Sequence, residues 1–293
     1  MIEVTKSILK TIYKKRPATT HKYDYGLLLT IGGSQFYSGS PALSALAAFR
    51  AGVDMVHIIA PKRAADIIAS FSPNLAAYPL EGERLTKQHL STLLEMTKSA
   101  EIVTKGKTAV VIGGGMGRSP ETQETILEYL SEIKIPAVID ADAIYAVAKK
   151  PEILKEKPFL ITPHGYEFFI LTGKEILGKK DEEKIKIVSE ETKRLKTTIL
   201  LKGKLDIIAD SKEDKIAINR TGHPTMSVGG TGDTLAGIAG AILARGENCF
   251  QAAGAAAYIN GLAGEKAAEK LGESMTATDL IEEISNVLNK KFK

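Results

Sequence analysis

The sequence predicts an α/β fold in which a mostly parallel sheet is covered by helices on both faces. Short apolar runs alternate along the chain with segments of helical pattern, which is typical of β-α-β units. These runs are continuously apolar, as expected of strands that are buried on both faces. Most of them end in glycines or polar residues, so we expect the carboxyl edge of the sheet to carry a ligand site.

The expected elements follow one another in order along the chain. Strands are expected at residues 26–31, 55–60, 109–112, 137–139, 159–161 and 198–201, and residues 207–209 and 215–218 can pair as a hairpin. Helices are expected at residues 41–51, 62–70, 120–133 and 182–195, and from Thr234 to the end of the chain. No linker and no internal repeat interrupts this order, so we expect residues 1–293 to form a single domain.

Composition narrows the class of protein. Of the 293 residues, 44% are hydrophobic and 25% are charged, which is typical of a globular protein. The net charge is only +4, and no basic run is interleaved with aromatics, so we expect no nucleic-acid partner. The single cysteine, Cys249, excludes an internal disulfide and fits a reducing cytoplasm. No segment approaches the roughly 20 apolar residues that span a bilayer, so we expect a cytoplasmic location and no membrane partner.

Glycine and polar residues follow five of the expected strands. They occupy residues 32–34, 113–118, 140–142, 162–164 with Glu167, and 202–204. Each segment alone is compatible with an ordinary loop, because Gly and Asp favour turns. Five at successive strand ends favour a shared site. The loop at residues 113–117 lacks GxGxxG spacing, which disfavours a dehydrogenase, but its glycines would let a phosphate-bearing ligand approach backbone amides.

The strongest signal is the turn Gly229-Gly230-Thr231-Gly232-Asp233, with a helix expected to begin at about Asp233. Amide groups at a helix start carry partial positive charge and can stabilise a phosphoryl group. We expect the Asp233 carboxylate to be ionised at neutral pH and able to take a proton from a substrate hydroxyl. Asp233 as a simple helix cap is the alternative, but a cap needs none of the three glycines.

Three other strand-end residues are candidates with ordinary alternatives. His164 is also compatible with a plain loop histidine, and Glu167 either orients Mg²⁺ through water or begins the next helix. Lys202 can reach a phosphate, although a lysine at a strand end is more often part of the surface. No His, Cys and Asp residues have the spacing of a zinc site, and no GxxxxGK[ST] loop is present.

Taken together, these motifs resemble the ADP-dependent NAD(P)H-hydrate dehydratases, which are ribokinase-like proteins. The resemblance rests on residues 33–34 with 37–39, 112–117 and 140–143, on Thr162-Pro163-His164 with Glu167, on Lys202-Gly203, and on the turn at residues 229–233. It runs in order from about Tyr25 to Leu280. The GGTGD turn alone is shared with other ribokinase-like kinases. The resemblance implies a ribokinase-like three-layer sandwich.

The resemblance also implies a reaction. Such an enzyme uses ADP, or ATP in some members, with Mg²⁺ to dehydrate the S epimer of hydrated NADH or NADPH, releasing AMP and phosphate when ADP is used. Asp233 would accept the hydroxyl proton, and the amides of Thr231, Gly232 and Asp233 would form the anion hole. The remaining assignments place the substrate near Ser40, Gly117, His164 and Asp233, and the adenine nucleotide near Lys202, Gly203, Lys204, Leu205, Asp206 and Gly232.

Two departures from the family pattern are small. Gly39-Ser40-Pro41 stands where Gly-Ala-Pro is common, and Gly113-Gly114-Gly115 stands where Gly-Pro-Gly is common. Many relatives carry an N-terminal epimerase domain, for which this chain has no room, so we expect no epimerase activity. The resemblance further implies a homo-oligomer, such as a tetramer.

Two other functions remain open. A kinase of the same fold that phosphorylates a vitamin-precursor alcohol would use the same turn, although Thr162-Pro163-His164 favours the dehydratase. A non-catalytic nucleotide-binding protein is disfavoured, because binding alone does not require a base at Asp233.

Overall fold

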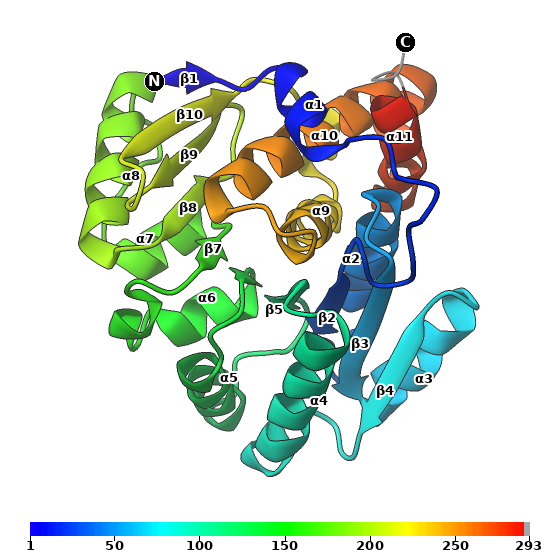
Figure 1. Cartoon of the computed structure of the whole chain (residues 1–293). Coiled ribbons are helices and arrows are strands. Elements are labelled where there is room, and N and C mark those ends of the chain that lie inside the picture. Colours follow the sequence, from blue (N-terminus) through cyan, green and yellow to red (C-terminus); the bar gives the residue numbers. More distant parts are fainter. Residues whose placement is uncertain (290–293) are drawn as a thin grey trace.

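The computed structural model describes residues 1–289, in which ten strands form one sheet (Figure 1). The strands are β1 (Ile2–Glu3), β2 (Leu27–Ile31), β3 (Met55–Pro61), β4 (Ala76–Leu80), β5 (Thr108–Ile112), β6 (Ala137–Ile139), β7 (Phe159–Ile161), β8 (Thr198–Leu201), β9 (Asp206–Asp210) and β10 (Lys215–Asn219). The α-helices are α1 (Ser7–Ile12), α2 (Gly39–Arg50), α3 (Lys62–Phe71), α4 (Leu90–Val103), α5 (Pro120–Glu132), α6 (Asp142–Val147), α7 (Gly165–Thr172), α8 (Asp181–Leu195), α9 (Thr231–Ala244), α10 (Cys249–Leu271) and α11 (Ala277–Asn289).

The strand order is β1-β10-β9-β8-β7-β6-β5-β2-β3-β4. Every neighbouring pair is parallel except β8–β9 and β9–β10, so β9 alone of these strands runs against the others. The predicted mostly parallel sheet and the predicted hairpin at β9 and β10 are both confirmed.

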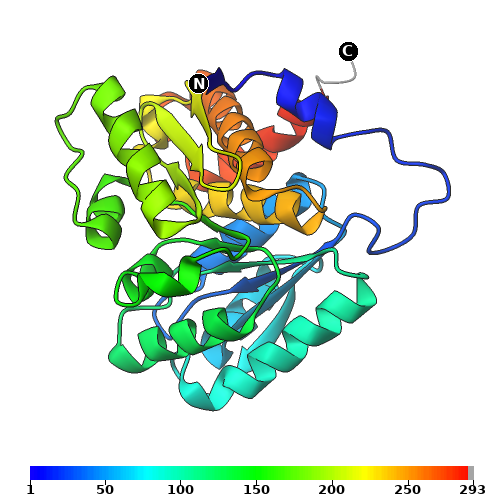
Figure 2. The same ribbon diagram turned by 60° about the vertical axis from the view of Figure 1, so that its left-hand side comes forward.

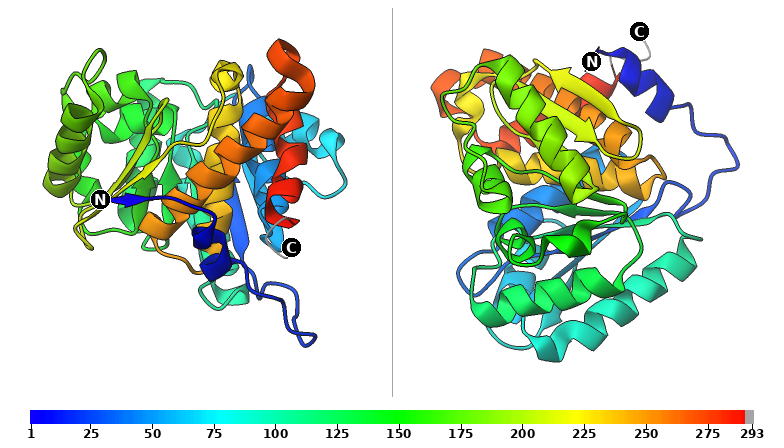
Figure 3. Two further views of the ribbon diagram at one scale, coloured as in Figure 1. Left: turned by 90° about the horizontal axis from the view of Figure 1, so that it is seen from above. Right: turned by 90° about the vertical axis from the view of Figure 1, so that its left-hand side faces the viewer.

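Each central strand contributes side chains to two separate cores. Leu28 of β2 and Val111 of β5 lie in a core with α2, α3, α9, α10 and α11. Leu29 and Val110, one residue away, lie in a second core with α4 to α8. This alternation follows from the two-residue period of a strand, and it produces the predicted helix–sheet–helix sandwich. The helices α9 and α10 lie side by side over one face (Figure 3).

Several elements were not expected from the sequence. The strands β1 and β4 lie at the two edges of the sheet, and β4 is half exposed and contains Pro79. The expected single helical region after Thr234 is instead three helices, because the chain turns at Gly246 (φ 102°) and Gly272 (φ 55°). The last four residues of that expected region, 290–293, lie outside the described residues.

A long segment without helix or strand joins α1 to β2 and loops away from the body of the molecule (Figure 2). In residues 1–289, no helix has the length and apolar character needed to cross a membrane.

Candidate active site

The predicted site residues meet at the carboxyl edge of the sheet. The strands β8, β7, β6, β5 and β2 are consecutive neighbours and all parallel, so the segments that follow them lie along one edge. The start of α9 lies at the same edge, because a Cβ atom placed on Gly114 would stand 3.0 Å from the Asp233 Oδ1 atom. The turn at residues 229–233 and the strand-end loops therefore form one site.

The amide groups of Thr231, Gly232 and Asp233, in the first turn of α9, have no hydrogen-bond partner within residues 1–289. Gly230 precedes the helix with a φ of 98°, a conformation that glycine adopts without strain. The helix begins at Thr231, two residues earlier than expected, and its first helical hydrogen bond runs from the Thr234 amide to the Gly230 carbonyl (3.0 Å). Among the described residues no side chain caps this helix. This geometry fits an anion hole and disfavours Asp233 as a simple cap.

Asp233 is half-buried beside the turn, and its carboxyl group has an unusual pKa. Burial and the nearby Asp140 raise the pKa of Asp233 to about 7, although a hydrogen bond from Ser40 and the charge of Lys202 lower it. The expectation that this carboxylate is fully ionised at neutral pH was therefore wrong, because desolvation outweighs the favourable helix start. A carboxylate with a pKa near 7 is well suited to act as a general base at neutral pH.

The glycine loop after β5 makes room for these groups. A Cβ atom on Gly114 would lie 2.9 Å from the Ser40 Cβ atom, in addition to its contact with Asp233. The Gly114 carbonyl accepts a hydrogen bond from the Gly33 amide (2.8 Å), which ties the loops after β2 and β5 together. The change from the common Gly-Pro-Gly pattern thus leaves a residue without a side chain at the closest approach.

Gly117, predicted to bind substrate, is held by a residue that we did not assign. The Asp142 carboxylate accepts hydrogen bonds from the Gly117 amide and the Arg118 Nε atom, both at 2.8 Å. The Arg118 guanidinium also lies 3.6 Å from the centre of the Tyr145 ring. Asp142 follows a strand end, which was the only sign in the sequence of this role.

Lys202 lies at the centre of a buried polar network. Its Nζ atom is 2.8 Å from the Asp140 Oδ1 atom and 3.8 Å from the Glu167 Oε2 atom. Burial alone would lower the pKa of Lys202, but the two carboxylates outweigh it and raise this pKa. The surface alternative for Lys202 is therefore wrong, and its ammonium group also lies 3.5 Å from the position of a Cβ atom on Gly232.

His164 caps α7, and Glu167 lies in the first turn of this helix. The Glu167 Oε2 atom accepts a hydrogen bond from the His164 amide (2.9 Å), and the His164 Nδ1 atom accepts from the Tyr166 and Glu167 amides (3.2 Å each). The neutral His164 ring therefore carries its proton on Nε2. Burial raises the pKa of Glu167, and Lys202 opposes this shift. Glu167 lies in the first turn of α7, as one of its two interpretations expected, and its contact to Mg²⁺ stays a prediction.

The predicted nucleotide segment is the loop between β8 and β9. The Gly203 amide and the Asn219 side-chain amide donate to the two oxygens of Asp206, each at 3.0 Å. Burial raises the pKa of Asp206 to about 6. Lys204 is exposed and Leu205 is half buried. Asn219 comes from β10, and no pattern in the sequence indicated that it would reach this loop.

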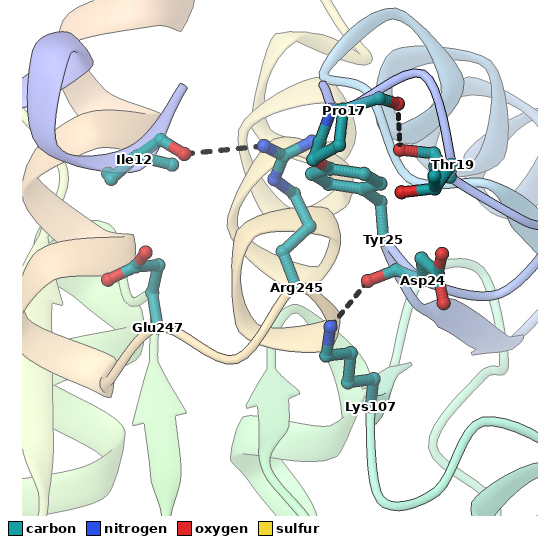
Figure 4. A pocket seen from close by; sticks show the side chains of 9 residues that line it. Ile12, Pro17, Thr19, Asp24, Tyr25, Lys107, Arg245 and Glu247 are labelled. Carbon is teal, nitrogen blue, oxygen red and sulfur yellow. Dashed lines mark hydrogen bonds between the residues drawn. The ribbon is translucent and has the colours of Figure 1, made fainter. Parts of the chain in front are cut away.

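Two cavities lie at the opposite, amino edge of the sheet. The larger, of about 300 Å³, is lined by residues that include Tyr25, Lys107 and Arg245 (Figure 4). The Arg245 guanidinium packs against the Tyr13 and Tyr25 rings and donates to the carbonyls of Gly52 (2.8 Å) and Ile12 (3.3 Å). These contacts tie the α1–β2 segment to the end of α9. A smaller cavity, of about 120 Å³, is lined in part by Cys249.

Comparison with known proteins agrees with the geometry. Residues 28–286 match the model of a family described as NAD(P)H-hydrate dehydratase. The chain belongs to this family. An ADP-dependent (S)-NAD(P)H-hydrate dehydratase from Nitrosopumilus maritimus is 34% identical over 286 residues, which are 97% of this chain and 96% of that protein.

Another relative of the chain is a longer protein. The bifunctional NAD(P)H-hydrate repair enzyme Nnr of Pyrobaculum aerophilum is 41% identical over 277 residues, which are 94% of this chain but 53% of that enzyme. The chain thus spans about half the length of the first curated relatives it matches.

Solved structures confirm the ribokinase-like fold. The ADP/ATP-dependent NAD(P)H-hydrate dehydratase of Bacillus subtilis, co-crystallized with ATP and Mg²⁺, superposes with a TM-score of 0.75 at 24% identity, and the match covers 99% of this chain and 97% of that one.

Proposed function

We propose that this protein is an ADP-dependent dehydratase that converts the S epimer of hydrated NADH or NADPH to NADH or NADPH, with release of AMP and phosphate. The observation that carries this proposal is the meeting of Asp233, whose pKa is about 7, with the unpaired amides of the first turn of α9. The name of the Nitrosopumilus maritimus relative, matched over nearly its whole length, supports the choice of substrate and of ADP.

The first step is a phosphoryl transfer. Asp233 accepts the proton of the substrate's 6-hydroxyl while that oxygen attacks the terminal phosphorus of ADP and AMP leaves. The amides of Thr231, Gly232 and Asp233 stabilise the charge on the transferring group. The phosphorylated intermediate then loses phosphate together with a proton from the neighbouring ring carbon, which regenerates the reduced nicotinamide.

The other site residues bind and orient the two reactants. The hydrate would contact Ser40, whose side chain is hydrogen-bonded to Asp233. It would also contact Gly117 and His164, which lie at the adjoining strand ends. The adenine nucleotide would be contacted by the loop after β8 and by the first turn of α9, that is, by Lys202, Gly203, Lys204, Leu205, Asp206 and Gly232. The loop that contains most of them begins at Lys202, whose half-buried ammonium group is suited to a phosphate.

Mg²⁺ is part of this proposal, supported by the conditions under which the Bacillus subtilis enzyme crystallized. The ion prefers oxygen ligands and usually keeps several of its waters. The buried Glu167 carboxylate, beside Lys202, fits a contact to Mg²⁺ through water. When bound with the nucleotide, the ion would neutralise phosphate charge.

The proposal is tested with purified protein, hydrated NADH and ADP. We expect the absorbance of reduced nicotinamide to return. The absence of recovery with both ADP and ATP, in protein shown to be folded, would reject the proposal. In that case, phosphorylation of a vitamin-precursor alcohol such as hydroxyethylthiazole would support the kinase alternative.

Three further expectations belong to the same proposal. A homo-oligomer, such as a tetramer, is tested by light scattering during size-exclusion chromatography. A single domain over residues 1–293 predicts one cooperative unfolding transition. Cell fractionation tests the expected cytoplasmic location.

A further inference from the structure

Asp140 is a buried carboxylate at the centre of the site to which no role in binding or catalysis is assigned above. It directly follows β6, and its side chain is 5% exposed. Its Oδ1 atom accepts hydrogen bonds from the Lys202 Nζ atom (2.8 Å) and the Thr162 Oγ1 atom (2.7 Å). Thr162 is itself fully buried. The carboxylate is thus fixed from two neighbouring strand ends.

The backbone around Asp140 is equally constrained. A Cβ atom on Gly113 would stand 1.8 Å from the Asp140 carbonyl oxygen, so only a glycine allows the loop after β5 to approach this closely. The next residue, Ala141, has a φ of 47° and a ψ of −123°. Residues other than glycine rarely adopt such values, and strained conformations of this kind persist where the surroundings enforce them, often at functional sites.

The partner that Asp140 holds is well placed for the reaction. A lysine side chain has four flexible carbons, and its ammonium group stays in one place only when a partner fixes it. The bond to Asp140 places the Lys202 ammonium beside Gly232 in the first turn of α9. Under the proposed function, the phosphoryl group of the nucleotide approaches this turn.

Asp140 also acts on Asp233 as a like charge. Asp140 and, more weakly, Asp142 disfavour ionisation of Asp233, whereas Lys202 and the bond from Ser40 favour it. The ammonium group of Lys202 is therefore coupled to both carboxylates, Asp140 and Asp233. Removing the charge of either Asp140 or Lys202 therefore changes the electrostatic potential at the Asp233 carboxylate.

We propose that Asp140 is a positioning residue, which fixes the Lys202 ammonium beside the first turn of α9 and holds a second negative charge near Asp233. This inference rests on the proposed function for its effect on turnover. Its electrostatic part concerns the free protein and can be measured without substrate.

The test is the variant Asp140→Asn, which keeps the size of the side chain and removes its charge. The titration of Asp233 is followed by NMR of labelled aspartate carboxyl carbons, assigned with Asp233→Asn. We expect the midpoint to fall by about 1 pH unit when the like charge is removed. ADP affinity, measured by calorimetry, and turnover are each expected to fall about tenfold, the scale of one charge-assisted hydrogen bond.

Asp210→Asn is the matched control. Asp210 is also buried and accepts a hydrogen bond from a threonine hydroxyl, that of Thr198 (2.5 Å), but it lies at the amino edge of the sheet. We expect this variant to leave the Asp233 midpoint and turnover unchanged. If Asp140→Asn behaves in the same way as this control, Asp140 is purely structural and the proposal is wrong.

A second variant protects the test against misfolding. Lys202→Met removes the ammonium and leaves the charge of Asp140 in place, so the Asp233 midpoint must rise, and an unchanged midpoint overturns the proposal. If hydrated NADH is not a substrate, the two NMR midpoints still decide whether Asp140 and Lys202 control Asp233. Failure of the proposed function is thereby separated from failure of this inference.

Discussion

Replacing Asp233 by asparagine should remove activity and increase the stability of the fold. The side chain keeps its size and can still contact Ser40, but it no longer accepts a proton from the substrate. We expect turnover to fall by about 10²-fold or more, the scale of a lost general base, while ADP affinity changes little.

The stability change follows from the pKa of the half-buried Asp233 carboxyl group. The pKa of Asp233 rises from an ordinary 3.8 to about 7 on folding, mainly because of burial. Each unit is worth about 1.4 kcal/mol, so the ionised carboxylate destabilises the fold by at most roughly 4 kcal/mol above pH 7. Because the folded pKa is the higher one, this penalty decreases as the pH falls below 7 and disappears below about 4.

Urea unfolding of the wild type and of Asp233→Asn at pH 8 and pH 5 measures this penalty. At pH 8 the variant should be more stable by up to roughly 4 kcal/mol, and at pH 5 the difference should be much smaller. If the variant has the same free energy of unfolding as the wild type at pH 8, or if its gain in stability does not depend on pH, then folding does not raise the pKa of Asp233. Unchanged turnover would remove it from the mechanism.

Three other predictions concern the same site. In the wild type, kcat/KM for hydrated NADH should rise about tenfold from pH 5 to pH 6 and level off above about pH 7, because Asp233 must be ionised; a flat profile measured by absorbance would contradict this. The variant Asp206→Asn should weaken ADP binding in calorimetry by about tenfold, because its carboxylate accepts bonds from both Gly203 and Asn219; unchanged affinity would place the nucleotide elsewhere. The variant Gly113→Ala should lower both turnover and stability, because a Cβ atom at this position would stand 1.8 Å from the Asp140 carbonyl oxygen; wild-type kinetics and an unchanged urea midpoint would contradict this.

The sequence allowed the order of the main elements and the location of the site to be predicted for identifiable reasons. The strands β2 and β5 are continuous apolar runs because both of their faces are buried, so their composition alone predicted them. The edge strand β4 was missed because it is half exposed and contains Pro79. The glycines of residues 229–232 indicated where α9 starts, because the turn before this helix requires a positive φ at Gly230.

The acidity of the site could not be predicted in the same way. The charge state of Asp233 depends on burial and on Asp140, which is 93 residues earlier in the chain. The Asp206–Asn219 bond likewise requires the antiparallel pairing of β9 and β10 to bring the two residues opposite each other. Such contacts between distant residues leave no local pattern in the sequence, whereas helix starts and strand ends do.

The central claim is that the protein dehydrates hydrated NADH at the expense of ADP, with Asp233 as the base. The stoichiometry of a single reaction tests this claim most directly. Purified protein is mixed with the S epimer of hydrated NADH and a limiting amount of ADP, and NADH, AMP and phosphate are quantified together. The account predicts one NADH and one phosphate for each AMP formed, with none of the three in Asp233→Asn above a trace. NADH formed without loss of ADP, or ADP consumed without formation of NADH, would contradict it.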